Sequence, residues 1–125
     1  MIVRRLTEAT TVEWGSGLSR RLLLDSDGMG FSIADTTVRP GTTSKMEYRN
    51  HLEAVYCIEG SGELVGTDGQ SHRIEPGVMY ALNKNDAHTL VADGETGLRV
   101  VCVFNPPLKG DERHAFDSDA EYSAY

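Results

Sequence analysis

Three residues with metal-binding side chains occur in separate β-rich segments of the chain. Glu53 and Tyr80 each lie in a largely apolar run, and His88 follows Tyr80 by eight residues. A carboxylate on an apolar strand face must be paired, metal-bound or neutralised. Together the carboxylate, phenolate and imidazole would form an open-sided site for a divalent metal such as Fe(II), completed by water or substrate. Tyr80 as a half-buried core aromatic and His88 as a surface imidazole near a turn are the plainer alternatives.

The segments that must position these residues are short and rich in β-formers. They recur about every 8 to 12 residues between turn signals, and helical periodicity is nearly absent. This pattern predicts an all-β chain folded as one antiparallel, jelly-roll-like barrel. The expected strands cover residues 2–5, 21–24, 31–38, 53–58, 63–65, 71–74, 78–82, 88–91 and 98–105.

Alternation along each strand predicts which side chains share a face. Glu53 shares its face with Val55 and Cys57, and three further sets follow the same rule. Each of these faces joins apolar residues to a polar group, which is typical of a small barrel that holds a ligand. The other sets are Val78, Tyr80 and Leu82; His88 and Leu90; and Val100, Cys102 and Phe104.

The length and charge of the chain limit the classes of function. A chain of 125 residues can bury roughly two-thirds of its unfolded surface, enough for one domain without a stabilising metal or disulfide. The net charge of −7 argues against nucleic acid or an anionic membrane as the main partner, because both bind clustered Lys and Arg. We therefore expect a small-molecule partner.

Two further features indicate a cytoplasmic protein. The first residues, MIVRRLTEAT, lack the apolar region of a signal peptide, and the longest apolar stretch, residues 100–104, is far too short to span a membrane. Cys57 and Cys102 are predicted to be buried, reduced thiols.

The excess negative charge is concentrated at the end of the chain. Residues 1–110, the expected barrel, carry a net charge of −3, and residues 111–125 carry −4. The latter would be either a solvated tail or a lid over the site, within the same domain.

The spacing of residues around Glu53 resembles that of a known fold family. Glycines at 41 and 60 frame Glu47, Arg49 and Glu53 with the rhythm of the first cupin motif. In that motif two histidines stand where Glu47 and Arg49 stand here, so the usual three-His-one-Glu metal site cannot form. Pro76-Gly77 followed by His88 resembles the second motif.

Four runs extend the resemblance to one cupin family, over the whole chain. YRNHLEAV (48–55), PGVMYAL (76–82), DGMGFS (27–32) and CVFNPP (102–107) resemble the ectoine synthases. This resemblance implies an Fe(II)-dependent hydro-lyase, in which other divalent metals such as Zn could substitute, acting in compatible-solute biosynthesis. Its reaction would be condensation of N4-acetyl-L-2,4-diaminobutanoate to ectoine with loss of water. The resemblance also implies a homodimer, and places the metal ligands on Glu53, Tyr80 and His88.

The resemblance also implies a set of substrate and catalytic residues. Arg21 could instead face solvent, and Cys102 and Phe104 could be core residues alone. Substrate-binding positions fall on Arg21, Thr36, Cys102, Phe104 and, with a local rearrangement, Trp14. The candidates for the catalytic base are Glu112 and His114 on the tail, with Tyr48 and His51 in reserve.

Some positions depart from the family pattern and leave alternatives open. Gly17 stands where the family usually has Trp, and Glu47, Ala34 and Asp35 also differ. We expect these positions near the pocket, where they bear on substrate identity. The alternatives are a paralogue that cyclises or hydrates a related amino-acid amide, a non-catalytic ligand-binding cupin and, less well supported by the single histidine, an iron oxygenase.

Overall fold

The computed structural model describes residues 1–116 and 119–125, so Asp117 of the predicted acidic tail lies outside the described residues. Within these ranges the chain is mostly β-structure, with two short 3-10 helices, η1 (Leu6–Glu8) and η2 (Asp25–Asp27). The strands are β1 (Thr10–Glu13), β2 (Gly17–Leu23), β3 (Ser32–Val38), β4 (Thr43–Glu47), β5 (Leu52–Gly60), β6 (Gly62–Gly66), β7 (Ser71–Ile74), β8 (Met79–Leu82), β9 (His88–Ala92), β10 (Leu98–Asn105) and β11 (Ser123–Ala124).

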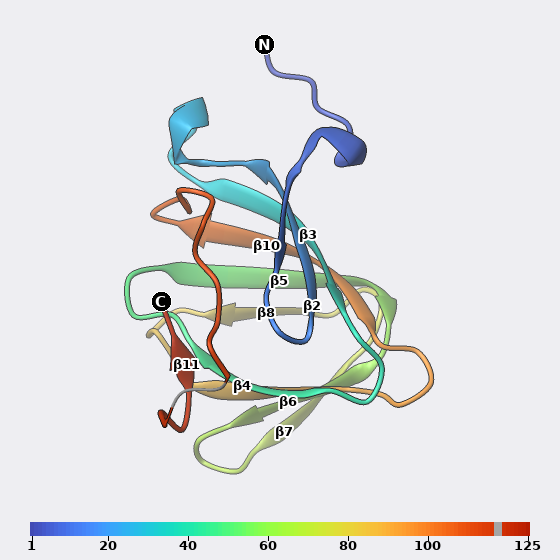
Figure 1. The fold of residues 1–125 in the computed structure, drawn as a ribbon. Helices are drawn as coiled ribbons and strands as arrows, with labels where there is room; N and C mark the ends of the chain where they lie inside the picture. The colour runs from blue at the N-terminus through green and yellow to red at the C-terminus, as the bar shows by residue number, and fades with distance from the viewer. Residues whose placement is uncertain (117–118) are drawn as a thin grey trace.

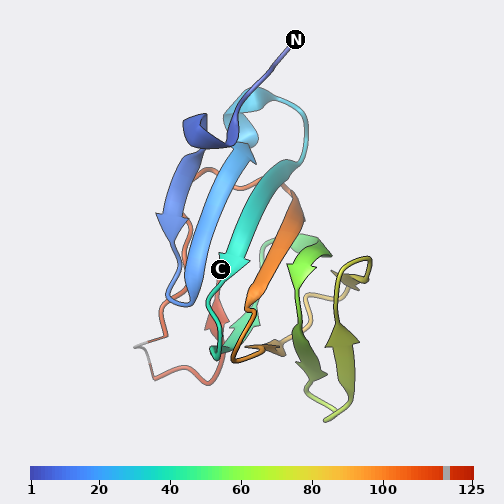
Figure 2. The same cartoon turned by 90° about the vertical axis from the view of Figure 1, so that its right-hand side faces the viewer.

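These strands form two sheets that face each other (Figure 1, and turned by 90° in Figure 2). The larger sheet has the order β1-β2-β3-β10-β5-β8, and the smaller has the order β11-β4-β9-β6-β7. Neighbouring strands pair antiparallel, except β11, which runs parallel to β4. The predicted all-β, jelly-roll-like fold is confirmed.

The apolar core lies between the two sheets because side chains alternate along each strand. In β10 every second residue from Leu98 to Phe104 is buried. Glu53, Val55 and Cys57 on β5 are likewise at most 5% exposed, so the shared faces predicted for these strands are confirmed. Because Phe104 pairs with Glu53 across the β10–β5 ladder, the carboxylate lies at one end of this core.

Four features of the strand prediction were wrong. Residues 2–5 form no strand, since Arg4 instead reaches Asp27 at 2.9 Å and the chain then turns into η1. Three strands were missed, β1, β4 and β11. Their sequences are short and rich in Thr, Ser, Lys and Glu, so the alternation is weak until the tertiary structure buries one face.

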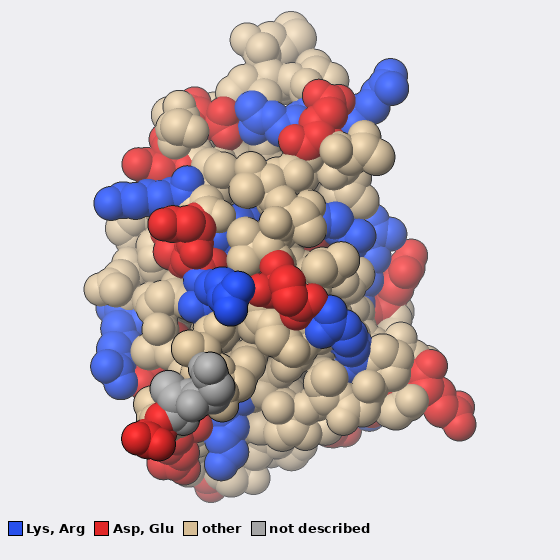
Figure 3. All heavy atoms as spheres, in the orientation of Figure 1, with Lys and Arg blue, Asp and Glu red and all other residues tan. Residues whose placement is uncertain are grey.

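The outer surface carries charges of both signs. Figure 3 shows acidic and basic side chains interspersed over the face seen there. On the outer face of the larger sheet, the Asp35 carboxylate accepts hydrogen bonds from Arg20 at 2.9 Å and from Arg99 at 2.7 and 3.0 Å. Among the described residues, no helix is long and apolar enough to cross a membrane.

Candidate functional site

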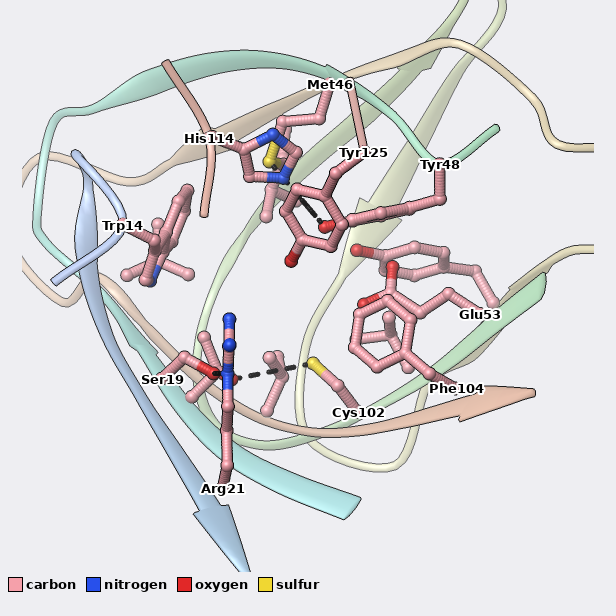
Figure 4. A pocket seen from close by; sticks show the side chains of 16 residues that line it. Trp14, Ser19, Arg21, Met46, Tyr48, Glu53, Cys102, Phe104, His114 and Tyr125 are labelled. Atoms are coloured by element: carbon pink, nitrogen blue, oxygen red, sulfur yellow. Dashed lines mark hydrogen bonds between the residues drawn. The ribbon is translucent and has the colours of Figure 1, made fainter. Parts of the chain in front are cut away.

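A cavity lies between the two sheets (Figure 4), at the end that the C-terminal segment crosses (Figure 1). Its walls are apolar side chains with a few polar groups among them. The lining residues are Trp14, Ser19, Arg21, Thr36, Val38, Met46, Tyr48, Glu53, Val55, Tyr80, Leu90, Val100, Cys102, Phe104, His114 and Tyr125.

Glu53 supplies the acidic group of the cavity. The alternation of β5 turns it inward, where it is 5% exposed. Burial raises the pKa of the Glu53 carboxyl to about 8, although a hydrogen bond with the Cys102 thiol opposes part of that shift. Among the ion pairs of the described residues none involves Glu53. A cation beside it would restore the carboxylate form.

Tyr80 and His88 complete this end of the site from β8 and β9. Tyr80 pairs with Val55, the inward neighbour of Glu53 on β5, and its ring centroid lies 6.4 Å from that of His88. Burial raises the pKa of the Tyr80 phenol and lowers the pKa of the His88 imidazole, so both groups favour their neutral forms without a cation.

These three residues fit a divalent cation. His88 Nδ1 lies 3.0 Å from the carbonyl oxygen of Asp86, which favours a proton on Nδ1, while the buried Nε2 has no hydrogen-bond partner. This is the usual arrangement of a metal-binding histidine. The described residues contain no group of three His, Cys, Asp or Glu that could hold a metal. A metal here would therefore need the Tyr80 oxygen as its third protein ligand.

The opposite end of the cavity is formed by hydrogen-bond donors. Arg21 on β2 is 2% exposed; it donates to Ser19 Oγ at 3.3 Å and to the backbone oxygen of Glu112. Its Nη1 lies 3.6 Å from the Glu112 carboxylate and, like the indole nitrogen of Trp14, has no hydrogen-bond partner. Buried donors without partners are rare in native structures, and together they would suit a ligand carboxylate.

The C-terminal segment covers the cavity with an aromatic cluster (Figure 4). His114 Nδ1 lies 2.9 Å from Ser123 Oγ, and its Nε2 lies 3.1 Å from the Tyr48 hydroxyl. Burial lowers the pKa of His114 to about 3, so the ring is neutral near pH 7. His114 and Tyr125 of the tail thus line the cavity, while most of the other described tail residues are exposed.

The structure brings most of the predicted site residues together and leaves some outside. Glu112 does not line the cavity: its carboxylate accepts the backbone N–H groups of Lys109 and Gly110, both at 2.8 Å. His51 also lies outside the lining, with Nδ1 2.7 Å from the Pro106 oxygen. The predicted residues that line the cavity are Trp14, Arg21, Thr36, Tyr48, Glu53, Tyr80, Cys102, Phe104 and His114. His88 is buried behind them, beside Tyr80.

None of the four positions that depart from the family pattern lines the cavity, although Ala34 pairs with the lining residues Arg21 and Cys102 on neighbouring strands. A Cβ on Gly17 would lie 1.8 Å from the Thr37 oxygen, so no larger residue fits there. Trp14, at the β1–β2 turn, reaches the cavity instead, and its backbone N–H donates a hydrogen bond to the Gly17 carbonyl oxygen at 3.0 Å. Glu47 pairs with Arg49 at 2.6 Å outside the cavity, and Asp35 points outward.

Ser19 and Tyr125 are site residues that the sequence analysis missed. Ser19 could have been found from the alternation of β2, because it lies two residues before Arg21 on the same face. Tyr125 gave no signal, because its place in the cavity depends on the parallel pairing of β11 with β4.

Fold and cavity together define a cupin-type protein with a partly open site between its two sheets. The sequence profile of the ectoine synthase family matches residues 1–124. The L-ectoine synthase of Desulfatibacillum aliphaticivorans is 53% identical over 98% of this chain and 96% of its own length. The L-ectoine synthase of Bordetella parapertussis is 48% identical over 98% of this chain and 95% of its own length.

Solved structures agree with these relatives. The crystal structure of ectoine synthase from P. lautus matches with a TM-score of 0.82 and 48% identity, over 88% of this chain and 81% of that one. The polyketide cyclase RemF from Streptomyces resistomycificus shares the fold. Its structure matches with a TM-score of 0.72 and 21% identity, over 90% of this chain and 86% of that one. The chain belongs to the ectoine synthase family, and its function is ectoine synthesis by a hydro-lyase.

Proposed function

We propose that this chain closes N4-acetyl-L-2,4-diaminobutanoate into the ring of ectoine, with loss of water, assisted by Fe(II). The observation that supports this most is the polarity of the cavity: Arg21 and the Trp14 indole lie at one end, and Glu53 and Tyr80 at the other. Such an amino acid carries its carboxylate at one end and its acetamide at the other. One orientation therefore satisfies both ends of the cavity.

Glu53, Tyr80 and His88 would hold the metal. Fe(II) is the proposed ion, with Zn as an alternative, since both accept carboxylate, imidazole and phenolate donors. When bound, a divalent ion would supply Lewis-acid polarisation of the acetamide oxygen.

Arg21 and Trp14 orient the substrate. The Arg21 guanidinium is fixed by Ser19 and Glu112, so its Nη1, which has no hydrogen-bond partner, is in place before the ligand arrives. Binding the carboxylate here bends the substrate between the two ends of the cavity. This brings the amine and the acetamide carbon together, which removes much of the entropic cost of ring closure.

Tyr48 and His114 form the path for the proton that the substrate amine must lose. Burial keeps His114 neutral, and its Nε2 lies 3.1 Å from the Tyr48 hydroxyl, so this pair would pass the proton on rather than keep it. Glu112 is committed to backbone N–H groups and Arg21, so its role is to hold the tail and the guanidinium. Exclusion of bulk water by His114 and Tyr125 would favour dehydration over the reverse hydrolysis.

An anaerobic assay of Fe(II)-loaded protein with N4-acetyl-L-2,4-diaminobutanoate tests the function, with ectoine measured by chromatography. We expect turnover in the wild type, and loss of both metal content and turnover in Glu53→Gln, with Glu59→Gln, an exposed residue of the same strand, as the matched control. Absence of ectoine would refute the function. Full activity after chelation would refute the metal assignment, and substrate binding without turnover would support a ligand-binding cupin.

We also propose a homodimer. The outer face of the larger sheet carries Tyr56 and Met79, cross-strand neighbours that are 47% and 58% exposed. Exposed apolar neighbours of this kind are typical of a surface that another chain covers. Sedimentation of the wild type and of Tyr56→Lys tests this: the wild type should sediment as a dimer, and a monomeric wild type would refute it.

The physiological setting is proposed as cytoplasmic compatible-solute synthesis under osmotic stress. Family membership supports this setting. Genes for an aminotransferase and an acetyltransferase beside this one are the expected observation, because those reactions would supply the acetylated diamine.

A further inference from the structure

Tyr125 lies just beyond residues 1–124, which the family profile matches, yet its side chain lines the cavity. Main-chain bonds hold it in place: its carbonyl accepts the Arg49 N–H at 2.8 Å, and its N–H donates to the Glu47 oxygen at 3.4 Å. These bonds continue the parallel pairing of β11 with β4 and do not involve the side chain. Backbone pairing, rather than a hydrogen bond of the side chain, therefore places the Tyr125 phenol at the site.

The Tyr125 ring packs on both members of the proton path. Its centroid lies 4.6 Å from that of His114, at an interplanar angle of 36°, and 5.0 Å from that of Tyr48. Burial raises the pKa of the Tyr125 phenol, and the neighbouring Tyr48 side chain offsets part of that shift. In Figure 4 the Tyr125 ring stands between His114 and the Glu53 side of the cavity, with its hydroxyl directed inward.

We propose that Tyr125 is a positioning residue for ring closure. Its ring holds the His114 imidazole in the plane that lets Nε2 meet the Tyr48 hydroxyl, and its contact with the Tyr48 ring keeps that hydroxyl at the cavity. The Phe116 ring also packs on the His114 imidazole, with 5.5 Å between the ring centroids. Loss of the Tyr125 ring therefore frees one side of the imidazole without exposing all of it. This proposal rests on the proposed role of Tyr48 and His114 in removing the proton.

Side-chain variants separate positioning from anchoring of the tail, because the main-chain bonds of Tyr125 remain in all of them. Tyr125→Phe keeps the ring and loses the hydroxyl, and Tyr125→Ala loses both. Tyr122→Ala is the matched control, since Tyr122 lies on the same tail and packs on Lys45 outside the cavity. Turnover number and KM are measured for each with Fe(II) and the acetylated substrate.

We expect kcat of Tyr125→Ala to fall by about 10- to 100-fold with KM changed by less than about threefold, the range for a displaced proton-transfer group. The kcat of Tyr125→Phe, which keeps the ring, should stay within roughly threefold of the wild-type value, and Tyr122→Ala should match the wild type. A rise of KM alone in Tyr125→Ala, or equal kcat in all variants, would overturn the proposal and leave Tyr125 as a wall of the cavity.

A spectroscopic measurement distinguishes this failure from failure of the proposed function. The chain has four histidines, so the ¹⁵N imidazole signals of His114 can be assigned from their loss in His114→Gln. We expect a single tautomer in the wild type and Tyr125→Phe, and tautomer exchange in Tyr125→Ala or, should that variant not fold, in Tyr125→Leu. An unchanged His114 spectrum would refute positioning whether or not the wild type makes ectoine.

Discussion

Acidification should detach the tail, because His114 is buried as a neutral base. Burial lowers the pKa of His114 to about 3 from 6.5, and the neighbouring His88 and Arg21 lower it further. The closed form binds fewer protons than the open form between these two values. Its stability is therefore full above pH 6.5 and falls as the pH falls toward 3.

The size of the effect follows from the shift. Each pKa unit corresponds to about 1.4 kcal/mol, so closure should lose about 2 kcal/mol by pH 5 and about 5 kcal/mol by pH 3. Tyr48 and Tyr125, which pack on His114, have pKa values raised by burial and stay neutral throughout. The Arg21–Glu112 pair persists over most of the window, because the pKa of Glu112 is lowered.

Trp14 gives a direct assay. It is the only tryptophan of the chain and is 5% exposed, with His114 and Phe116 each 6.2 Å away between ring centroids. Quenching of its fluorescence by acrylamide should rise between pH 6 and 4 in the wild type, with far-ultraviolet dichroism unchanged. His114→Gln, which keeps hydrogen-bonding groups and does not titrate, should show no such rise. An equal midpoint in both proteins would refute the reasoning.

Three further changes have expected outcomes. Gly17→Ala should lower the free energy of unfolding in urea by about 3 kcal/mol, since its Cβ meets the Thr37 oxygen, while Gly94→Ala, with open space around it, should stay within about 0.5 kcal/mol. Asp35→Asn should cost about 1 to 3 kcal/mol in the same assay, because Arg20 and Arg99 lose the carboxylate that they share. Arg39→Ala, in the exposed pair with Glu13, should cost less than about 1 kcal/mol; equal losses would contradict this. Arg21→Lys should raise KM about tenfold by losing the planar fork, whereas the outward Arg20→Lys should not; equal KM values would remove Arg21 from the carboxylate site.

Local patterns predicted the β-fold and one end of the site. Alternation put Glu53 inside with Val55 and Cys57, and the same rule buried His88 and Cys102. The alternation rule succeeded because these strands bury one complete face, so every second side chain points into the core. It failed for β1, β4 and β11, whose polar sequences show no such contrast.

The tertiary structure decided how distant segments close the cavity. No side chain fits at Gly17, and Trp14 on the β1–β2 turn reaches the cavity in its place. Tyr125 reaches the cavity because β11 pairs with β4. The sequence by itself therefore determined the fold class and the residues that fit a metal, since both follow from period-two patterning and side-chain chemistry. Only the folded chain decided which groups cover that site, because contacts between segments some 70 to 100 residues apart leave no periodic signal in either segment.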